Sequence, residues 1–292
     1  MFHLDFFGVA ASGLMQLMYL LRQKDVASPH ENFHLLLILA YHAALIATMV
    51  GKQPTLYARY RVPIYAIVRP LGYLSPTVRN TRHAAAQLLA NPASPGLLGM
   101  LADLKRLMLA SRVTGTAVIG VVVAVDPAVS LAVQYICSYL AAANSGYCST
   151  QMMSDPLTQR RVAGFSSLMD LLTLPFSAMV PLPKGEADVA TAARQCVGLL
   201  FYLQLIVSIM LPVYILVRSM PQSFLPRPPP PLPAAAGSWA QLQHSVQRAY
   251  AAANLSVWRT FRVPQSGALP SSLVFWLVVA LSWTLALALH GL

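Results

Sequence analysis

Long apolar stretches alternate with basic, proline-containing segments along the whole chain. Five of these stretches have the length and composition of membrane-spanning helices, namely 4–21, 33–50, 113–143, 197–217 and 272–289. A helix of about 20 apolar residues is long enough to cross the hydrocarbon core of a bilayer. The pattern therefore predicts an all-α integral membrane protein, a polytopic helical bundle with five spans. No basic residue precedes the first run, so we expect a retained helix rather than a cleaved signal peptide.

The stretch 163–183 is harder to assign. It is only moderately apolar, contains Asp170 and has prolines at 175, 181 and 183. We expect it to lie at the membrane interface or to re-enter the membrane, and the count becomes six spans if it crosses.

The run 113–143 carries one charge, Asp126, which is followed by Pro127. Proline disfavours helical geometry in the residue before it, whereas Asp and Pro are favoured at the N-cap and first positions of a new helix. The pair predicts either a kink in one crossing or a break between two helices. A third alternative is a re-entrant hairpin with Asp126 at its tip, because each half is short for a full crossing.

Two further segments have the pattern of amphipathic interfacial helices. One begins at Ser94-Pro95, with apolar residues at 97, 101, 104 and 108, and the other follows Gly237, with an apolar stripe from Trp239 to Phe261. Basic amphipathic helices of this kind lie at the headgroup level of a membrane, where anionic lipid attracts them.

The segment 221–233 is rich in proline and should form an extended polyproline II spacer. Arg227, Pro230 and Pro233 have the RxxPxxP spacing of an SH3 ligand, which indicates a cytoplasmic protein partner if the segment is not a plain spacer.

Composition excludes an ordinary soluble domain, because 57% of residues are apolar and only 10% are charged, against about a quarter charged in typical soluble domains. The net charge of +11 lies mainly in the segments 51–112 and 218–271. The first segment holds nine cations and one acid, and the second holds five cations and no acid. The prolines of the first segment predict that it is broken into short helical or extended pieces. Segments this basic belong on the cytoplasmic face. With no binding motif beside the charge, we expect no nucleic-acid partner.

If both basic segments are cytoplasmic, an even number of crossings separates them. We therefore expect 113–143 to cross and 163–183 not to; the alternative is the hairpin at 113–143 with 163–183 as the span. In the five-span arrangement Cys148 and Cys196 share the outer side and could pair, whereas the hairpin places them on opposite faces. Both arrangements leave the sequon at Asn254 in the cytoplasm and unmodified.

The letters His30-Glu31-x-x-His34 fit the HExxH pattern of zinc hydrolases, in which two imidazoles on one helical face hold the metal and the Glu acts as general base. A third ligand would have to come from Glu186 or Asp188. The same letters also form a capping box at a helix start, and we expect no bound metal.

Ionisable residues within apolar spans are candidates for transport, and Asp126 and His42 are the two that the pattern offers. The sequence thus predicts a non-catalytic multi-pass membrane protein acting as anchor, scaffold or complex subunit, whose partners are the bilayer and its anionic headgroups. The alternatives are a small transporter or channel using Asp126 and His42, and a membrane zinc hydrolase. No nucleotide-binding or serine-hydrolase motif is visible, and no cofactor is expected.

Overall fold

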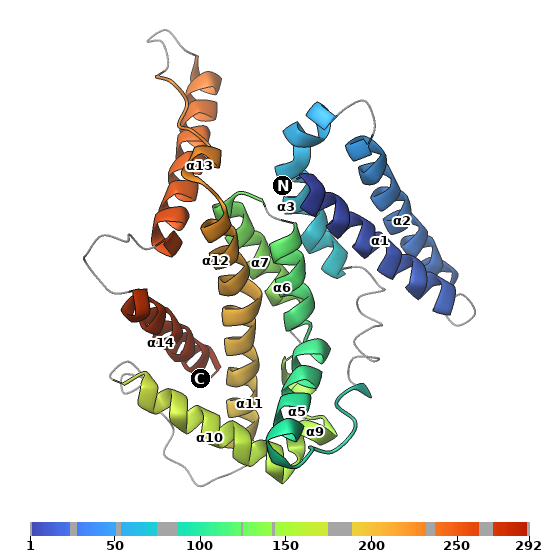
Figure 1. Cartoon of the computed structure of the whole chain (residues 1–292), viewed down its shortest axis with the longest axis vertical. Helices are drawn as coiled ribbons and strands as arrows, with labels where there is room; N and C mark the ends of the chain where they lie inside the picture. The colour runs from blue at the N-terminus through green and yellow to red at the C-terminus, as the bar shows by residue number, and fades with distance from the viewer. Residues whose placement is uncertain are drawn as a thin grey trace. The chain divides into compact units, whose positions relative to one another are not determined.

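The computed structural model describes residues 2–23, 28–50, 54–74, 87–123, 125–141, 144–174, 189–231, 237–262 and 271–290. Within these ranges every regular element is helical, which confirms the predicted all-α class (Figure 1). The α-helices are α1 (Phe2–Gln23), α2 (Pro29–Val50), α3 (Pro54–Leu74), α5 (Gly96–Ala110), α6 (Val113–Val122), α7 (Pro127–Ala141), α8 (Asn144–Cys148), α9 (Gln151–Ser154), α10 (Pro156–Leu172), α11 (Val189–Leu203), α12 (Leu211–Ser219), α13 (Ser238–Arg262) and α14 (Ser271–His290). A π-helix, η2 (Gln204–Met210), joins α11 to α12, and a short 3₁₀ helix, η3 (Gln222–Phe224), follows α12.

The chain packs as two compact units. The first takes in Met1–Pro70, Ile119–Gln134 and Leu211–Ala268, and the second takes in Leu71–Val118, Tyr135–Met210 and Leu269–Leu292.

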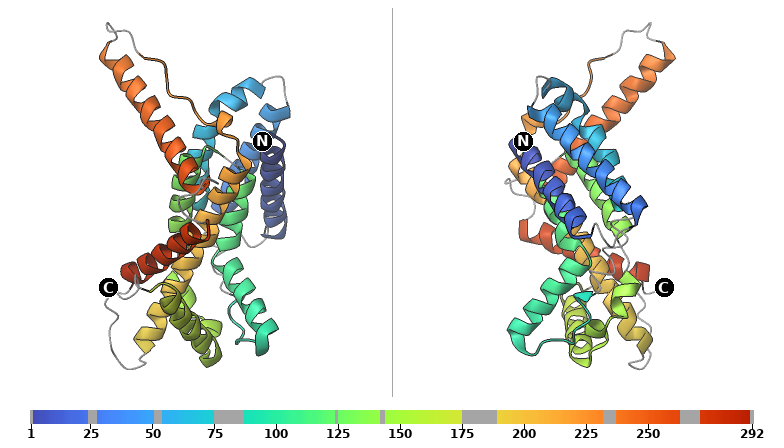
Figure 2. Two further views of the ribbon diagram at one scale, coloured as in Figure 1. Left: turned by 60° about the vertical axis from the view of Figure 1, so that its left-hand side comes forward. Right: turned by 90° about the vertical axis from the view of Figure 1, so that its right-hand side faces the viewer.

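In the first unit, α1 and α2 lie side by side (Figure 2). A buried cluster joins them to α3 and to the end of α6 through Val9, Leu45, Tyr57 and Val123. The approach of α1 to α6 is close at Gly8, where a Cβ would lie 2.5 Å from the Val122 side chain. A second cluster packs α12 against α13.

In the second unit, a buried cluster joins the segments on either side of 113–143, with Leu107 from one flank and Tyr147 and Met152 from the other. Cys148 and Cys196 in the same unit form a disulfide, with their Cα atoms 5.9 Å apart. The helices α10, α11 and α14 pack around Trp283, whose indole NH donates to Asp170 at 2.8 Å.

The run 113–143 forms two helices, α6 and α7, that are separated at Asp126-Pro127. Its two flanks are bonded to each other: the Met152 NH donates to the Leu89 carbonyl at 3.0 Å, and Arg161 donates to Asp103 at 3.0 Å. The chain therefore leaves the second unit at α6 and returns to it at α7. Both flanks of the run thus belong to one buried cluster, and whether 113–143 crosses a membrane stays a prediction.

The disulfide bears on the side of the membrane that each arrangement assigns to Cys148 and Cys196. The hairpin alternative put Cys148 and Cys196 on opposite faces, which their bond contradicts. The pairing that the five-span arrangement allows is found.

The basic segment 51–112 was expected to be broken into short pieces by its prolines. For 54–74 this expectation is wrong, because α3 runs through both Pro63 and Pro70 over 21 residues. A proline inside a helix removes one backbone hydrogen bond, and tertiary packing of the inner face can offset that loss. The helix expected from Ser94-Pro95 onward is found as α5, and the helix expected after Gly237 is found as α13.

Two helices in the described ranges are long and apolar enough to cross a membrane, judged by length and composition. They are Asn32–Val50, and Gln195–Ser219 in the continuous helix α11–η2–α12. Both coincide with spans expected from the sequence. The stretch 163–183 contributes its first part to α10, and 175–183 lies outside the described residues.

Candidate functional site: buried polar contacts between helices

One face of α3 carries polar side chains at every fourth position. Tyr57, Arg61, Tyr65 and Arg69 form this α3 polar stripe, and the spacing of four residues places them on one side of the helix. Tyr57, Tyr65 and Arg69 are buried, and Arg61 is largely so. Four polar groups on the inner face of one helix require partners, because an unsatisfied polar group in an apolar interior is costly.

The N-terminal part of the stripe, Tyr57 and Arg61, binds Asp5 of α1, whose side chain is 1% exposed. Arg61 reaches both carboxylate oxygens, through Nε to Oδ2 and through Nη2 to Oδ1, the latter at 2.8 Å. The Tyr57 hydroxyl donates to Oδ2 at 2.9 Å, and the hydroxyls of Tyr57 and Tyr65 are 3.2 Å apart. A two-pronged guanidinium contact with an added hydroxyl is the geometry that compensates a carboxylate for loss of water.

The C-terminal member of the stripe, Arg69, binds α7. Arg69 donates to the Gln134 side-chain oxygen at 2.7 Å, and both residues are buried. The Gln134 amide lies directly against Gly120 of α6, where any Cβ would overlap it. Gly120 is therefore the position that lets Gln134 reach between the helices. The four-residue spacing continues beyond the stripe to Tyr73, whose hydroxyl bonds Thr116 at 2.7 Å in the second unit.

Asp126 sits at the start of α7, where its carbonyl accepts the first helical bond from the Ser130 NH at 2.8 Å. The sequence pattern suggested that the Asp126 carboxylate caps the helix, but it does not. Instead it accepts a hydrogen bond from the Tyr250 hydroxyl of α13. The cap is supplied by Asn254 of α13, whose Oδ1 accepts from the Ala128 NH at 2.9 Å.

Asn254 is fully buried, and its Nδ2 also donates to the Tyr250 carbonyl at 3.0 Å. Both ends of the amide are thus bonded within the fold, so the folded sequon offers no free acceptor nitrogen. Burial, together with the hydrogen bond to Asp126, raises the pKa of Tyr250 above its ordinary value. The phenol therefore stays protonated and remains a donor at physiological pH.

His42 links α2 to α1. Its Nδ1 lies 2.7 Å from the Ile38 carbonyl and its Nε2 lies 3.0 Å from the Ser12 hydroxyl. A neutral imidazole with its proton on Nδ1 satisfies both contacts, donating to the carbonyl and accepting from the hydroxyl. Asp126 and His42 thus bond to different partners, and the structure does not join them in one polar path.

The rings of His30 and His34 meet edge to face, with centroids 4.4 Å apart on one face of α2. The side chain of Glu31 and the proposed third ligands Glu186 and Asp188 lie outside the described residues. Among the residues that the structure does describe, no group of three or more His, Cys, Asp or Glu side chains could hold a metal ion.

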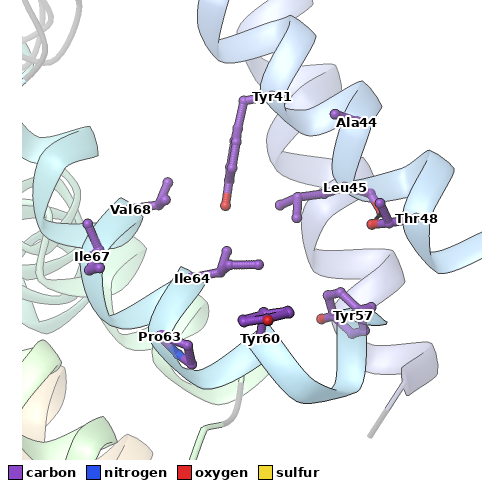
Figure 3. A pocket seen from close by; sticks show the side chains of 10 residues that line it. All are labelled: Tyr41, Ala44, Leu45, Thr48, Tyr57, Tyr60, Pro63, Ile64, Ile67 and Val68. Carbon is purple, nitrogen blue, oxygen red and sulfur yellow. Dashed lines mark hydrogen bonds between the residues drawn. The ribbon is translucent and has the colours of Figure 1, made fainter. Parts of the chain in front are cut away.

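A pocket of about 490 Å³ opens between α2 and α3 (Figure 3). Its lining is apolar and aromatic, with Leu45 and Tyr41 from α2 and Tyr60 and Ile64 from α3. The Tyr41 hydroxyl points into it and has no hydrogen-bond partner among the described residues. Such a lining suits an apolar chain or side chain and offers no convergent set of polar groups for chemistry.

The α3 polar stripe was not predicted from the sequence, because Arg61 and Arg69 were counted as cations of a basic segment. The repeat of Tyr and Arg at four-residue intervals is the signal that could have found it.

The sequence matches no protein-family model, no curated protein and no solved structure. Fold and site therefore define a class: an all-helical protein, with two helices suited to crossing a membrane, whose polar groups bind one helix to another.

Proposed function

We propose that this protein is a non-catalytic multi-pass membrane protein that serves as an anchor, scaffold or complex subunit. The observation that carries the proposal is the use made of its buried polar groups. Asp5, His42 and Asp126 each bond to a side chain of a neighbouring helix, on α3, α1 and α13 respectively. Polar groups that are hydrogen-bonded between helices fix the register of one helix against the next, which is a known role of buried polar contacts.

The crossings follow from chain connectivity in the described helices. The flanks of 113–143 pack together, so this run makes a hairpin and returns to the face it left. The helix α11–η2–α12 then carries the chain across, over about 37 Å for the 25 residues Gln195–Ser219. We propose that α1, α2, α3, α11–η2–α12 and α14 are the five crossings, with α3 as a crossing instead of 113–143.

A place for α3 in the membrane requires polar partners for the arginines on its inner face. Arg61 is ion-paired with Asp5, whereas Arg69 keeps its charge and donates a hydrogen bond to the neutral side chain of Gln134. Arginines in a membrane face the bundle interior and pair with polar groups there, as both of these do.

Two independent features assign the same side to the cytoplasm. The Cys148–Cys196 disulfide belongs in an oxidising compartment, which puts α8 and the start of α11 on the outer side. We place 218–271, with five arginines and no acid, across the membrane on the cytoplasmic side, where basic connecting segments lie. The same arrangement puts 75–112, with five cations and one acid, on the outer side, so it gives up the expectation that both basic segments share the cytoplasmic face.

The test extracts the full chain from its own membrane in polymer nanodiscs and weighs it by native mass spectrometry. A scaffold or complex subunit gives a mass in stoichiometric excess of one chain plus lipid. A lone chain that also conducts protons or ions after reconstitution in liposomes would overturn the proposal.

One observation favours a second candidate, a small proton or ion pathway. The carboxylate of Asp5 and the hydroxyls of Tyr57 and Tyr65 form a continuous chain of hydrogen bonds along α3. The original candidates Asp126 and His42 would act separately in such a protein. The assay is proton flux into liposomes: Tyr57→Phe, which removes the middle hydroxyl, abolishes flux if the chain conducts and leaves it unchanged if the chain is structural.

A further inference from the structure

We propose that the proline-rich segment after α12, residues 226–231, is a docking site for an SH3-type domain that carries acidic side chains beside its aromatic groove. The inference deepens the proposed role as a complex subunit and rests on it. The chain enters the segment extended: Leu225, the residue before it, has φ −68° and ψ 146°, close to the polyproline II values of about −75° and +145°.

The segment is held on α13 at two points. Leu225 is 8% exposed and packs in a cluster with Leu216 and Met220, against Leu255 and Trp258 of α13. Five residues further on, the Pro230 carbonyl bonds a ring nitrogen of His244 at 2.9 Å. A free spacer has no need of either contact. These two contacts hold the segment near α13 at its start and near its end.

Burial follows the three-residue repeat of a polyproline II helix. Pro226 and Pro229, one turn apart, are half-buried, whereas Arg227 and Pro230, also one turn apart, are exposed. One edge of the segment is thus partly covered, and another edge is open to solvent. On the open edge a basic side chain is followed three residues later by proline.

The chemistry of the open edge selects its partner. Arg227 is the one charged residue in 221–237, so a complementary surface needs an acidic group at one end of a groove that takes prolines. SH3 domains bind polyproline II ligands in aromatic-lined grooves of this kind. Charge complementarity sets the orientation of the ligand. Because five of the six residues 226–231 are proline, whose φ is restricted by the ring, less conformational entropy is lost on binding than for an ordinary chain. Pro233, the last position of the RxxPxxP spacing, lies outside the described residues.

The test titrates the full chain in lipid nanodiscs with a purified SH3 domain that recognises RxxPxxP ligands. Nanodiscs expose both faces, so the result does not depend on membrane sidedness or on any transport activity. We expect saturable binding that Arg227→Glu weakens at least tenfold and Pro230→Ala also weakens. Arg248→Glu, the same charge change at an exposed position of α13, is the matched control and should leave binding unchanged.

A synthetic peptide covering 221–237 separates the ways in which the proposal can fail. If the peptide binds and the full chain does not, α13 masks the segment and the proposal is wrong. If neither binds, or if Arg227→Glu has no effect, the basic edge is not a recognition surface. Tighter binding of a WW domain, insensitive to Arg227→Glu, would identify a different partner and equally overturn the assignment.

Discussion

The ion pair between Asp5 and Arg61 offers the sharpest test of how the helices are held together. Asp5→Asn removes the negative charge and keeps an oxygen that can accept from the Tyr57 hydroxyl. The guanidinium of Arg61, whose side chain is 14% exposed, is then left without its counter-charge. Breaking one half of a buried pair costs about 3–5 kcal/mol, because the remaining charge is poorly solvated.

The double variant Asp5→Asn/Arg61→Met provides a stricter test of the ion pair. Replacing both members of a buried pair by uncharged groups is often close to neutral. The double variant should therefore be more stable than Asp5→Asn alone, and the cycle should show a coupling energy of about 2 kcal/mol or more.

Reversible unfolding in mixed micelles, followed by tryptophan fluorescence, measures the four free energies. Arg248→Met, at an exposed position of α13, is the control and should change stability by no more than about 0.5 kcal/mol. Single variants that cost less than about 1 kcal/mol, or a double variant whose cost is the sum of the two, would show that the pair behaves as a surface contact.

Three other contacts lead to predictions of the same kind. Tyr250→Phe should cost about 1–3 kcal/mol at pH 7, because Asp126 loses a donor; since the pKa of Tyr250 is raised in the fold, its contribution is complete below pH ~10 and is lost as the pH rises further. The difference in unfolding free energy between the two proteins should therefore stay constant from pH 8 to about 10 and shrink from there to pH 11, and a difference that does not shrink would refute the contact. Replacing Cys148 and Cys196 together by Ala, or reducing them, should cost about 2–4 kcal/mol; labelling of both thiols in the unreduced folded protein would contradict the disulfide. Gly120→Ala should cost about 1–3 kcal/mol by overlapping the Gln134 amide, whereas Gly115→Ala on the same helix, where a methyl meets nothing within 4 Å, should be nearly neutral; equal effects would rule out the close approach.

The fold class and most helix positions could be predicted from the sequence, because apolar runs and amphipathic periods report burial directly. The break at Asp126-Pro127 could be predicted for the same local reason, since both residues favour a helix start. The direction that the chain takes after the break could not be predicted. It depends on contacts such as Arg161 with Asp103, which join residues far apart in the sequence.

The site was predicted less well than the fold. Asp126 was identified as an ionisable residue in an apolar run, but its partner Tyr250 lies 124 positions away and has no local signal. Arg61 and Arg69 were read as loop cations, because charge counting treats every arginine as solvated. Prolines in 54–74 reinforced that interpretation, although tertiary packing of the stripe outweighs their local effect.

The proposed membrane arrangement depends most on 113–143 returning to the side it left, because that return would set the side of every later segment. Single cysteines at Leu98, Gln151 and Arg248, all exposed positions, can be labelled with a membrane-impermeant maleimide in sealed vesicles. The account predicts that positions 98 and 151 react from one side and position 248 reacts from the other. If positions 98 and 248 react together and 151 reacts from the opposite side, 113–143 crosses the membrane once and the arrangement proposed here is wrong.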